Sequence, residues 1–220
     1  MAATTLRLGP ADREALFAGA ETLGVDLEPA DLDRFAEFAG LLDTWRVKTN
    51  LISCRDSREL VERHLLDSLA LARHLDPRGG IVDLGSGAGF PGVPLAVARA
   101  GGPVLLVEAR RRRANFLRAV KRQLGLNHVA VLEQRAESLS PDSSVKRQKE
   151  IRNVVSRAVW PDGEIFGIAA RWVGVGGRLL WMRTEVSGSD DPGEEFERVG
   201  VEEYRVGSAG PRAIHVFERR

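Results

Sequence analysis

The sequence is poor in cysteine and in long apolar runs, and it carries almost no net charge. Cys54 is the only cysteine, which excludes an internal disulfide framework and a zinc site built from several cysteines, and favours a reducing compartment. No uncharged apolar stretch approaches the roughly 18 to 20 residues that a membrane span needs. The N-terminal residues lack the apolar segment of a secretory signal. We therefore expect a cytoplasmic protein that does not enter the membrane and holds no metal.

The net charge of +1 hides a separation of charge along the chain. Residues 110–122 contain four consecutive arginines and no acidic residue, whereas residues 185–203 are mostly acidic among their charged positions. A protein with one basic face can bind a polyanion without being basic overall. Each run is equally typical of a solvated surface. Both interpretations stay open at this point.

Two helices are predicted before residue 77. Apolar residues recur every three or four positions from Leu32 to Trp45, with Asp31 as the expected N-cap, and again from Ser57 to about Leu75. After Pro77 the pattern changes to short apolar runs that alternate with amphipathic stretches. We predict a helical extension over residues 1–77 and a core over residues 78–220.

The core is predicted to have an α/β fold with a mostly parallel sheet covered on both faces. The expected strands are 81–84, 104–108, 129–133, 154–156 and 178–182, and the expected helices are 93–99, 112–124, 136–139 and 164–172. The runs 201–206 and 213–218 leave no room for a crossover helix and should form an antiparallel hairpin. This is the outline of a Rossmann-like, seven-stranded class I methyltransferase.

The most informative segment is residues 83–92, which read D-L-G-S-G-A-G-F-P-G between a strand and a helix. Ligands bind at the carboxyl ends of such strands. Glycines let the backbone turn sharply and let a ligand approach closely. Gly87, Gly89 and Gly92 also match the dinucleotide pattern G-x-G-x-x-G, so a nicotinamide cofactor is one candidate.

Asp83 favours the other candidate, S-adenosylmethionine. A carboxylate beside the loop suits the ammonium group of a methionine moiety and would repel a pyrophosphate. Glu108, at the end of the second strand, is placed to accept both ribose hydroxyls of either ligand. The loop after the third strand, which contains Ala136 and Glu137, should border the adenine. Trp160 is one of three tryptophans in the core that are candidates for stacking on a base.

Five motifs together resemble the glucose-inhibited division protein B family, the bacterial 16S rRNA (guanine-N7)-methyltransferases. They are Trp45 with Asn50-Leu51, the R-H-L-L-D-S-L stretch at 63–69, the loop 83–91 with its Phe90-Pro91, Arg113 with Asn115-Phe116-Leu117, and finally Arg135-Ala136-Glu137 with Ser156-Arg157-Ala158. The stretch at 63–69 is specific to this family among methyltransferases. The resemblance covers residues 41–160 well and the remainder loosely.

The resemblance implies a set of site residues. By resemblance, Gly85, Phe90, Ala136, Glu137 and Arg157 contact the cofactor, and His64, Asp67 and Ser68 line or support the mouth of the pocket. Together with the loop and strand residues, the expected cofactor residues are Asp83, Gly85, Ser86, Gly87, Gly89, Phe90, Glu108, Ala136, Glu137 and Arg157, and the expected catalytic residues are Arg157, His64, Asp67 and Ser68. The expected cofactor is S-adenosyl-L-methionine, and the expected partner is 16S rRNA in the 30S subunit. The protein itself is expected to be a monomer. The basic run Arg110, Arg111, Arg112 and Arg113, together with Arg183, is expected to contact RNA phosphates.

The sequence lacks the N-P-P-[YF] motif of amino-group methylation and the second cysteine of pyrimidine C5 chemistry, which agrees with a guanine N7 target. Guanine N7 carries a free lone pair, so its methylation needs positioning and charge stabilisation rather than a strong base. Departures from the family pattern lie on the substrate side: Asn153 where an acid is common, Arg183-Thr184 in place of Lys-Gly, and an atypical Val159-Trp160-Pro161-Asp162. Two alternatives therefore remain: a divergent RNA methyltransferase with another target, and a non-catalytic RNA-binding protein that keeps the fold.

Overall fold

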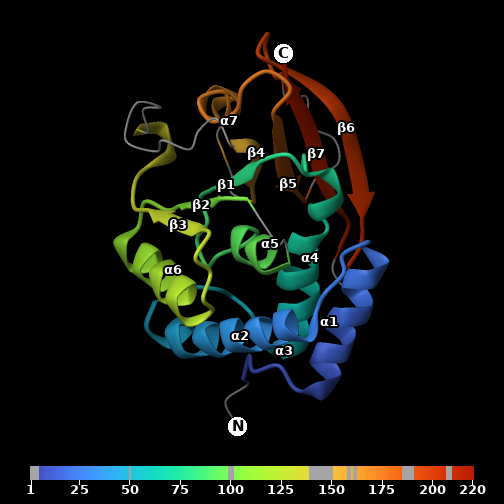
Figure 1. Cartoon of the computed structure of the whole chain (residues 1–220), viewed down its shortest axis with the longest axis vertical. Helices are drawn as coiled ribbons and strands as arrows, with labels where there is room; N and C mark the ends of the chain where they lie inside the picture. The colour runs from blue at the N-terminus through green and yellow to red at the C-terminus, as the bar shows by residue number, and fades with distance from the viewer. Residues whose placement is uncertain are drawn as a thin grey trace.

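The structure is a computed structural model that describes residues 5–49, 51–98, 102–138, 151–157, 160, 163–184, 191–206 and 210–220 (Figure 1). These residues form one seven-stranded sheet in the order β3-β2-β1-β4-β5-β7-β6. The strands are β1 (Gly80–Leu84), β2 (Val104–Val107), β3 (Val129–Leu132), β4 (Ile151–Ser156), β5 (Arg178–Arg183), β6 (Phe196–Tyr204) and β7 (Arg212–Arg219). Strands β1 to β5 are parallel, and β7 is antiparallel to both of its neighbours. The predicted mostly parallel sheet with a C-terminal hairpin is confirmed.

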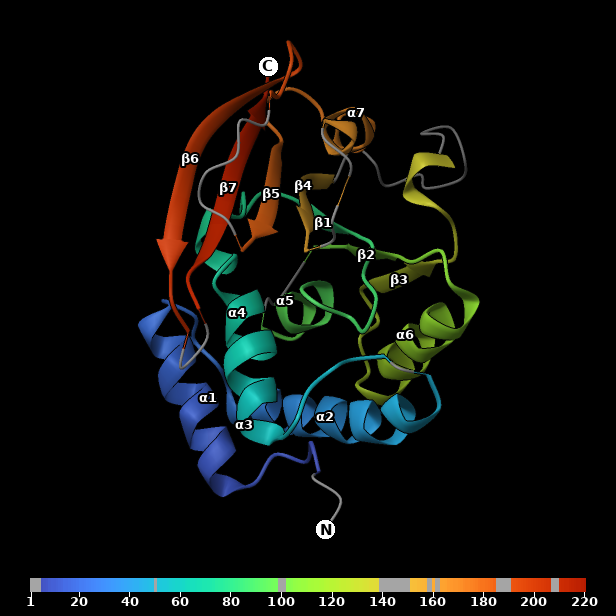
Figure 2. The ribbon, with the colours of Figure 1, turned by 180° about the vertical axis from the view of Figure 1, so that it is seen from behind.

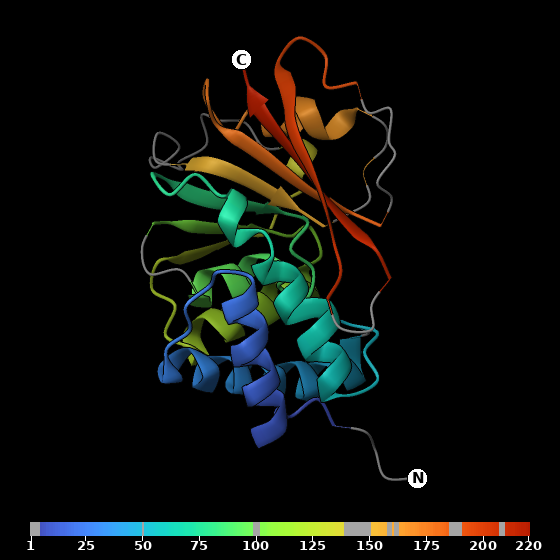
Figure 3. The same ribbon diagram turned by 90° about the vertical axis from the view of Figure 1, so that its right-hand side faces the viewer.

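Helices cover both faces of this sheet. They are α1 (Pro10–Thr22), α2 (Pro29–Thr49), α3 (Ser57–Leu60), the π-helical η1 (Val61–Leu66), α4 (Asp67–Leu69), the 3-10 helix η2 (Ala72–His74), α5 (Gly92–Ala98), α6 (Arg111–Gln123), the 3-10 helix η3 (Ala136–Ser138) and α7 (Glu164–Ala169). Figures 2 and 3 show α1, α2, α4, α5 and α6 on one side of the sheet and α7 on the other.

Alternation along the strands explains the two layers. In β2, Val104 and Leu106 pack into the cluster that holds the N-terminal helices, α5 and α6, while Leu105 and Val107 pack into the cluster of α7. Successive side chains of a strand point to opposite faces, so a strand buried on both faces is apolar throughout. The helices before residue 77 thus share one hydrophobic core with the sheet. The boundary at residue 77 stays a prediction.

Three local expectations differ from the structure. Asp31 is not an N-cap: α2 starts two residues earlier with Pro29 at its first position, and the Asp31 side chain accepts a hydrogen bond of 3.1 Å from the Glu28 amide. Helix α1 was not predicted. The helix expected from Ser57 to Leu75 is continuous only to Leu69 and contains the π-helical segment Val61–Leu66. Such segments are rare and concentrate at functional sites.

The sheet order fixes where a ligand can bind. The chain runs outward from β1 to β2 and β3 in one direction and then returns to place β4 on the other side of β1. This reversal between β1 and β4 is the switch point at which open α/β sheets bind ligands, outside the carboxyl ends of the strands. Asp83 in β1 lies beside Val155 in β4, so the glycine loop and the segment after Ser156 leave the sheet side by side. Within the described residues, no helix has the length and apolarity needed to cross a membrane.

Candidate active site

The loop after β1 is a tight cradle held to the neighbouring strand. The amides of Gly85 and Ser86 both donate to the Val107 carbonyl at 3.0 Å, and the amide of Gly89 donates to the Ser86 carbonyl at 2.7 Å. Gly85, Gly87 and Gly89 have φ of +74°, +56° and +96°, a region that favours glycine. Ser86 is buried and donates its hydroxyl to the Asp83 carbonyl at 3.0 Å, so it shapes the loop.

Asp83 lies beneath this loop with no solvent exposure. Its Oδ2 accepts a 3.0 Å hydrogen bond from the Gly92 amide, at the start of α5, and its Oδ1 is buried without a partner among the described residues. Burial raises the pKa of Asp83 from 3.8 to about 7. A buried carboxylate oxygen that lacks a donor is the group that a cation would satisfy. The predicted contact with a ligand ammonium fits this arrangement and stays a prediction.

Glu108 fastens the opposite wall of the cradle. It follows β2, and its two carboxylate oxygens accept hydrogen bonds from the Gly87 amide at 2.9 Å and the Arg110 amide at 2.7 Å. A carboxylate has about four acceptor positions, so two remain for a ligand. Glu108 therefore links the loop after β1 to the loop after β2.

A cavity of about 270 Å³ opens beside Glu108. Its walls bring together four predicted cofactor residues from three separate loops: Gly85, Glu108, Ala136 and Glu137. Trp160 also lines this cavity, and its indole nitrogen donates to the Ser156 hydroxyl at 2.9 Å. The sequence suggested Trp160 only as a candidate for stacking on a base, and the structure places it in the wall of this cavity.

On the other side of the loop, the Phe90 ring contacts the Arg157 guanidinium and the His64 imidazole. The Arg157 guanidinium lies 5.0 Å from the Phe90 ring centroid, and the His64 ring centroid lies 5.1 Å from it. Arg157 follows β4, His64 lies in η1, and Phe90 ends the glycine loop. An arginine over an aromatic face is held by the ring's quadrupole. Three residues that the resemblance grouped together are thus in contact.

Asp67 anchors Arg157 from behind. The carboxylate is 1% exposed; its Oδ2 lies 3.4 Å from Arg157 Nη1, and its Oδ1 accepts a 2.7 Å hydrogen bond from the Tyr204 hydroxyl. The Arg212 Nε lies 3.9 Å from the same Oδ1. Asp67, which the sequence suggested as a catalytic residue, therefore joins the helix to the segment after β4 and to the C-terminal hairpin. Nothing in the sequence pointed to Tyr204 or Arg212.

His64 and Ser68 take different places. The Nδ1 of His64 is buried and has no partner among the described residues. Burial, and then the positive charge of Arg157, lower the pKa of His64 to about 3, so its imidazole is neutral at physiological pH. Ser68 is fully buried and donates its hydroxyl to the His64 carbonyl at 2.6 Å, which supports the helix but does not reach a cavity.

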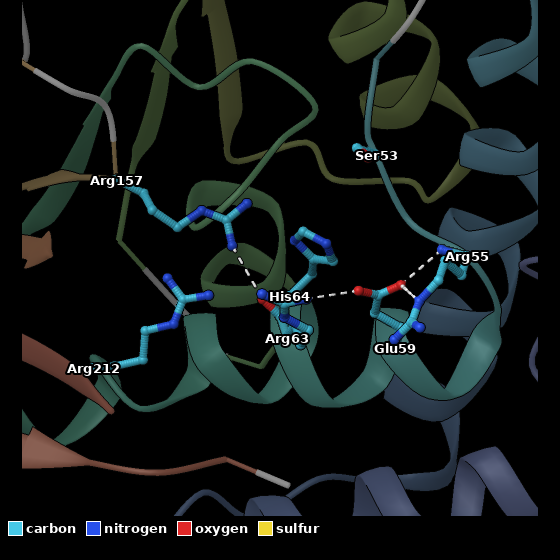
Figure 4. A pocket seen from close by; sticks show the side chains of 7 residues that line it. All are labelled: Ser53, Arg55, Glu59, Arg63, His64, Arg157 and Arg212. Carbon is cyan, nitrogen blue, oxygen red and sulfur yellow. Dashed lines mark hydrogen bonds and ion pairs between the residues drawn. The ribbon is translucent and has the colours of Figure 1, made fainter. Parts of the chain in front are cut away.

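The largest described cavity at this end of the sheet is a cleft of about 710 Å³ (Figure 4). Its lining consists of Ser53, Arg55, Glu59, Arg63, His64, Arg157 and Arg212. Two of these, His64 and Arg157, were predicted as catalytic residues. Figure 4 shows Arg157 and Arg212 on one side of His64, and Arg55 with Glu59 on the other. We call this cavity the arginine cleft.

The predicted RNA-binding arginines lie outside both cavities. Arg110, Arg111 and Arg112 are exposed where α6 begins, and Arg113 is half-buried beside the glycine loop. Arg183, at the end of β5, has its guanidinium 4.6 Å from the Trp181 ring centroid. The structure thus brings the predicted cofactor residues together, with Arg113 beside their loop, and leaves Arg110, Arg111, Arg112 and Arg183 at the periphery. Among the described side chains, no group of His, Cys, Asp and Glu is placed to hold a metal ion.

Comparison with known sequences gives one consistent result. Residues 31–200 match the GidB family model, described as rRNA small subunit methyltransferase G. A protein named ribosomal RNA small subunit methyltransferase G from Aromatoleum aromaticum is 37% identical over 83% of this chain and 81% of its own length. The protein of the same name from Deinococcus deserti is 37% identical over 82% of this chain and 73% of its own length.

Solved structures agree on the fold. A crystal structure of MtNAS in complex with MTA and tNA has a TM-score of 0.53 at 19% identity, over 94% of this chain and 70% of that one. That of P. horikoshii TYW2 in complex with MeSAdo has a TM-score of 0.52 at 13% identity, over 71% and 62%. In this chain, the Asp83 Oδ1, which lacks a donor in the described part of the chain, suits the ammonium group of S-adenosylmethionine, and the cavity beside Glu108 suits its adenosine. The chain therefore belongs to the rRNA small subunit methyltransferase G family and is an S-adenosylmethionine-dependent methyltransferase.

Proposed function

We propose that this protein methylates N7 of a guanine in 16S rRNA, and that it acts as a monomer on the 30S subunit in the cytoplasm. The proposal is supported by the position of the glycine loop beside the cationic arginine cleft. The histidine in the lining of that cleft, His64, is a poor proton acceptor. A pKa of about 3 makes His64 unsuited to remove a proton at neutral pH. Guanine N7 needs no deprotonation, whereas an amino group would.

The residues of the cradle position the methyl donor. Asp83 and Glu108 would hold the amino-acid end and the ribose of S-adenosylmethionine, which supplies the methyl group. Gly85, Ala136 and Trp160 would enclose the adenine in the smaller cavity. Contacts at both ends of the ligand would limit the direction in which a nucleophile can approach.

Arg157 is placed to orient the base. Its guanidinium stacks on Phe90 and is tied to Asp67, so it presents N–H donors at the edge of the arginine cleft. A single N–H donor of this kind suits the O6 of a guanine and leaves N7, on the same Hoogsteen edge, free to react. Because N7 lies on that edge, the target base must be exposed in a loop or flipped from its stack.

Methylation of 30S particles with labelled S-adenosylmethionine tests the proposal. We expect the label in 16S rRNA at a guanine. Cleavage of the RNA strand by chemistry specific to 7-methylguanosine should identify its position. Label at another position would instead indicate a different target within the same family. Label that enters only protein or a small molecule would reject an RNA substrate altogether.

A further inference from the structure

The arginine cleft has a symmetrical construction that the predicted catalytic residues do not explain. Two buried carboxylates on one helical stretch, Glu59 and Asp67, each hold two arginines. Glu59 accepts from Arg63 Nη1 at 2.8 Å and from Arg55 Nε at 3.1 Å. Asp67 holds Arg157 and Arg212 at 3.4 and 3.9 Å. The four guanidinium groups are thereby fixed around one cavity (Figure 4).

The charges around the cleft do not balance. Four arginines line it, and among the described side chains their acidic partners in the two clusters are Glu59 in the lining and Asp67 behind it, so four positive charges face two negative ones. Hydrogen bonds from the Arg55 amide and from both arginine side chains lower the pKa of Glu59 to about 2, so it is ionised and fully engaged. Burial is the main cause of the low pKa of His64, and the positive charges of Arg157, Arg63 and Arg212 lower it further. The cleft is therefore a site of positive potential.

Arg55 and Arg63 differ from Arg157 in their position. Their side chains are 83% and 43% exposed, whereas those of Arg157 and Arg212 are 22% and 20% exposed. The cleft is therefore cationic from its solvent-facing rim to its floor, where Arg157 meets Phe90 of the glycine loop. A guanidinium whose direction is fixed by a buried partner loses less entropy when it binds an anion.

From this arrangement we propose that the rim residues Arg55 and Arg63, with Arg212 of the C-terminal hairpin, form a clamp for backbone phosphates of the RNA strand next to the target nucleotide. The inference rests on the proposed function and adds the interface through which the substrate is held. Planar guanidinium groups bind phosphate oxygens bidentately, and phosphate contacts set the position of a nucleic acid without reading its sequence. The clamp would place the base above Arg157.

The test uses the full chain and a short single-stranded oligoribonucleotide that contains guanine. Binding is measured by fluorescence anisotropy at several salt concentrations for wild type and for the double variant Arg55→Ala with Arg63→Ala. We expect the slope of log K against log salt to fall in magnitude by about 1.4, as loss of two phosphate contacts on a single strand predicts. In the 30S assay KM should rise about tenfold or more, with little change in kcat.

Two other solvent-accessible arginines provide a matched control. Arg13 and Arg58 are also ion-paired to acidic side chains, and neither lines the cleft. Their double alanine variant changes the net charge equally and should keep the wild-type slope and KM. Because the test variant leaves the Glu59 carboxylate unpaired, the triple variant Arg55→Gln, Glu59→Gln and Arg63→Gln removes that charge and should show the same loss of slope.

The outcomes separate the two proposals. Normal methylation of 30S particles by wild type, with slope and KM unchanged in both cleft variants, overturns the clamp and leaves the function standing. Equal losses in the control variant also overturn it, because net charge alone would then explain the effect. Absence of RNA methylation by wild type, with S-adenosylmethionine bound, refutes the proposed function instead. Loss of RNA binding only in the cleft variants, at wild-type S-adenosylmethionine affinity, supports the clamp.

Discussion

The Tyr204 hydroxyl donates a 2.7 Å hydrogen bond to Asp67 Oδ1, across 137 positions of the sequence. Both residues are buried, and the same carboxylate holds Arg157. Burial, and then the negative charge of Asp67, raise the pKa of Tyr204 above its ordinary value, so the phenol stays protonated and keeps donating. The hairpin is thus attached to the helix that lines the arginine cleft.

Replacing Tyr204 by Phe should destabilise the protein by about 1.5–3 kcal/mol, because a buried carboxylate then loses a hydrogen bond. The change is read from the midpoint of urea unfolding at constant m-value. Tyr204 is the only tyrosine, so the variant leaves the tryptophan fluorescence signal intact. An unchanged midpoint would mean that Asp67 does not depend on this bond.

Replacing Asp83 by Asn should weaken S-adenosylmethionine binding more than tenfold, because the amide keeps the acceptor for Gly92 but removes the charge that faces the ammonium group. Methylthioadenosine has the same ribose and base without the amino-acid chain, so its affinity should not change. Isothermal titration with both ligands checks this. Equal losses for the two ligands would show that Asp83 acts only through the shape of the loop.

The folding stability and the S-adenosylmethionine affinity should change with pH in opposite directions. Asp83 has a pKa of about 7 in the folded protein and an ordinary value of 3.8, so the folded state binds more protons between these values, and its stability falls as pH rises through them. A cationic ligand requires the ionised form, so S-adenosylmethionine affinity should fall about tenfold per pH unit below 7. Asp83→Asn should remove both trends and raise the unfolding midpoint of the free protein at pH 8.

Replacing Glu108 by Gln should weaken S-adenosylmethionine and methylthioadenosine alike, since both carry the ribose. We expect about a tenfold loss for each, as for one charge-assisted hydrogen bond. The contrast with Asp83→Asn distinguishes the two ends of the cradle in a single titration series. Retained affinity for methylthioadenosine would place the ribose elsewhere.

Trp160 provides an optical signal. If the indole borders the adenosine cavity, ligand binding should change tryptophan fluorescence, and Trp160→Phe should abolish most of that change. Trp45, Trp172 and Trp181 remain as internal references. A ligand-induced signal that persists in the variant would come from one of those residues and would contradict the assignment of this wall.

Replacing Arg111 and Arg112 together by Ala tests the basic run at the start of α6. Their exposure leaves them free to meet phosphates, and loss of two contacts should reduce the salt slope of RNA binding by about 1.4. The measurement is the same anisotropy series as for the cleft variants. An unchanged slope would make these arginines a solvated surface and leave the cleft as the main phosphate site.

The fold could be read from the sequence where local pattern determines it. Apolar runs separated by amphipathic segments gave the parallel strands, and the absence of room for a helix gave the hairpin. Helix α1 was overlooked, although Pro10 at its first position and Asp12 accepting from the Gly9 amide are a recognisable start. The π-helical segment Val61–Leu66 lies in a stretch whose apolar spacing predicted an ordinary helix.

The site was predictable only in part, for a similar reason. Residues that follow a strand, such as Glu108 and Arg157, could be placed because the carboxyl ends of parallel strands meet at one edge. Tyr204 and Arg212 could not, since their contacts with Asp67 depend on how a distant hairpin packs. The sequence could not reveal the roles of Arg55 and Glu59, because their i,i+4 spacing is common on surface helices and does not indicate a cleft.

Strand β7 is the latest of the described strands to be synthesised, yet it lies between β5 and β6. Until it is inserted, β6 has no partner and Arg212 is missing from the wall of the cleft. The order in which the sheet assembles therefore cannot follow the order of translation. A nascent chain exposes unpaired strand edges, and the arginine cleft is completed only after the strands that carry the glycine loop and Glu108 have been made.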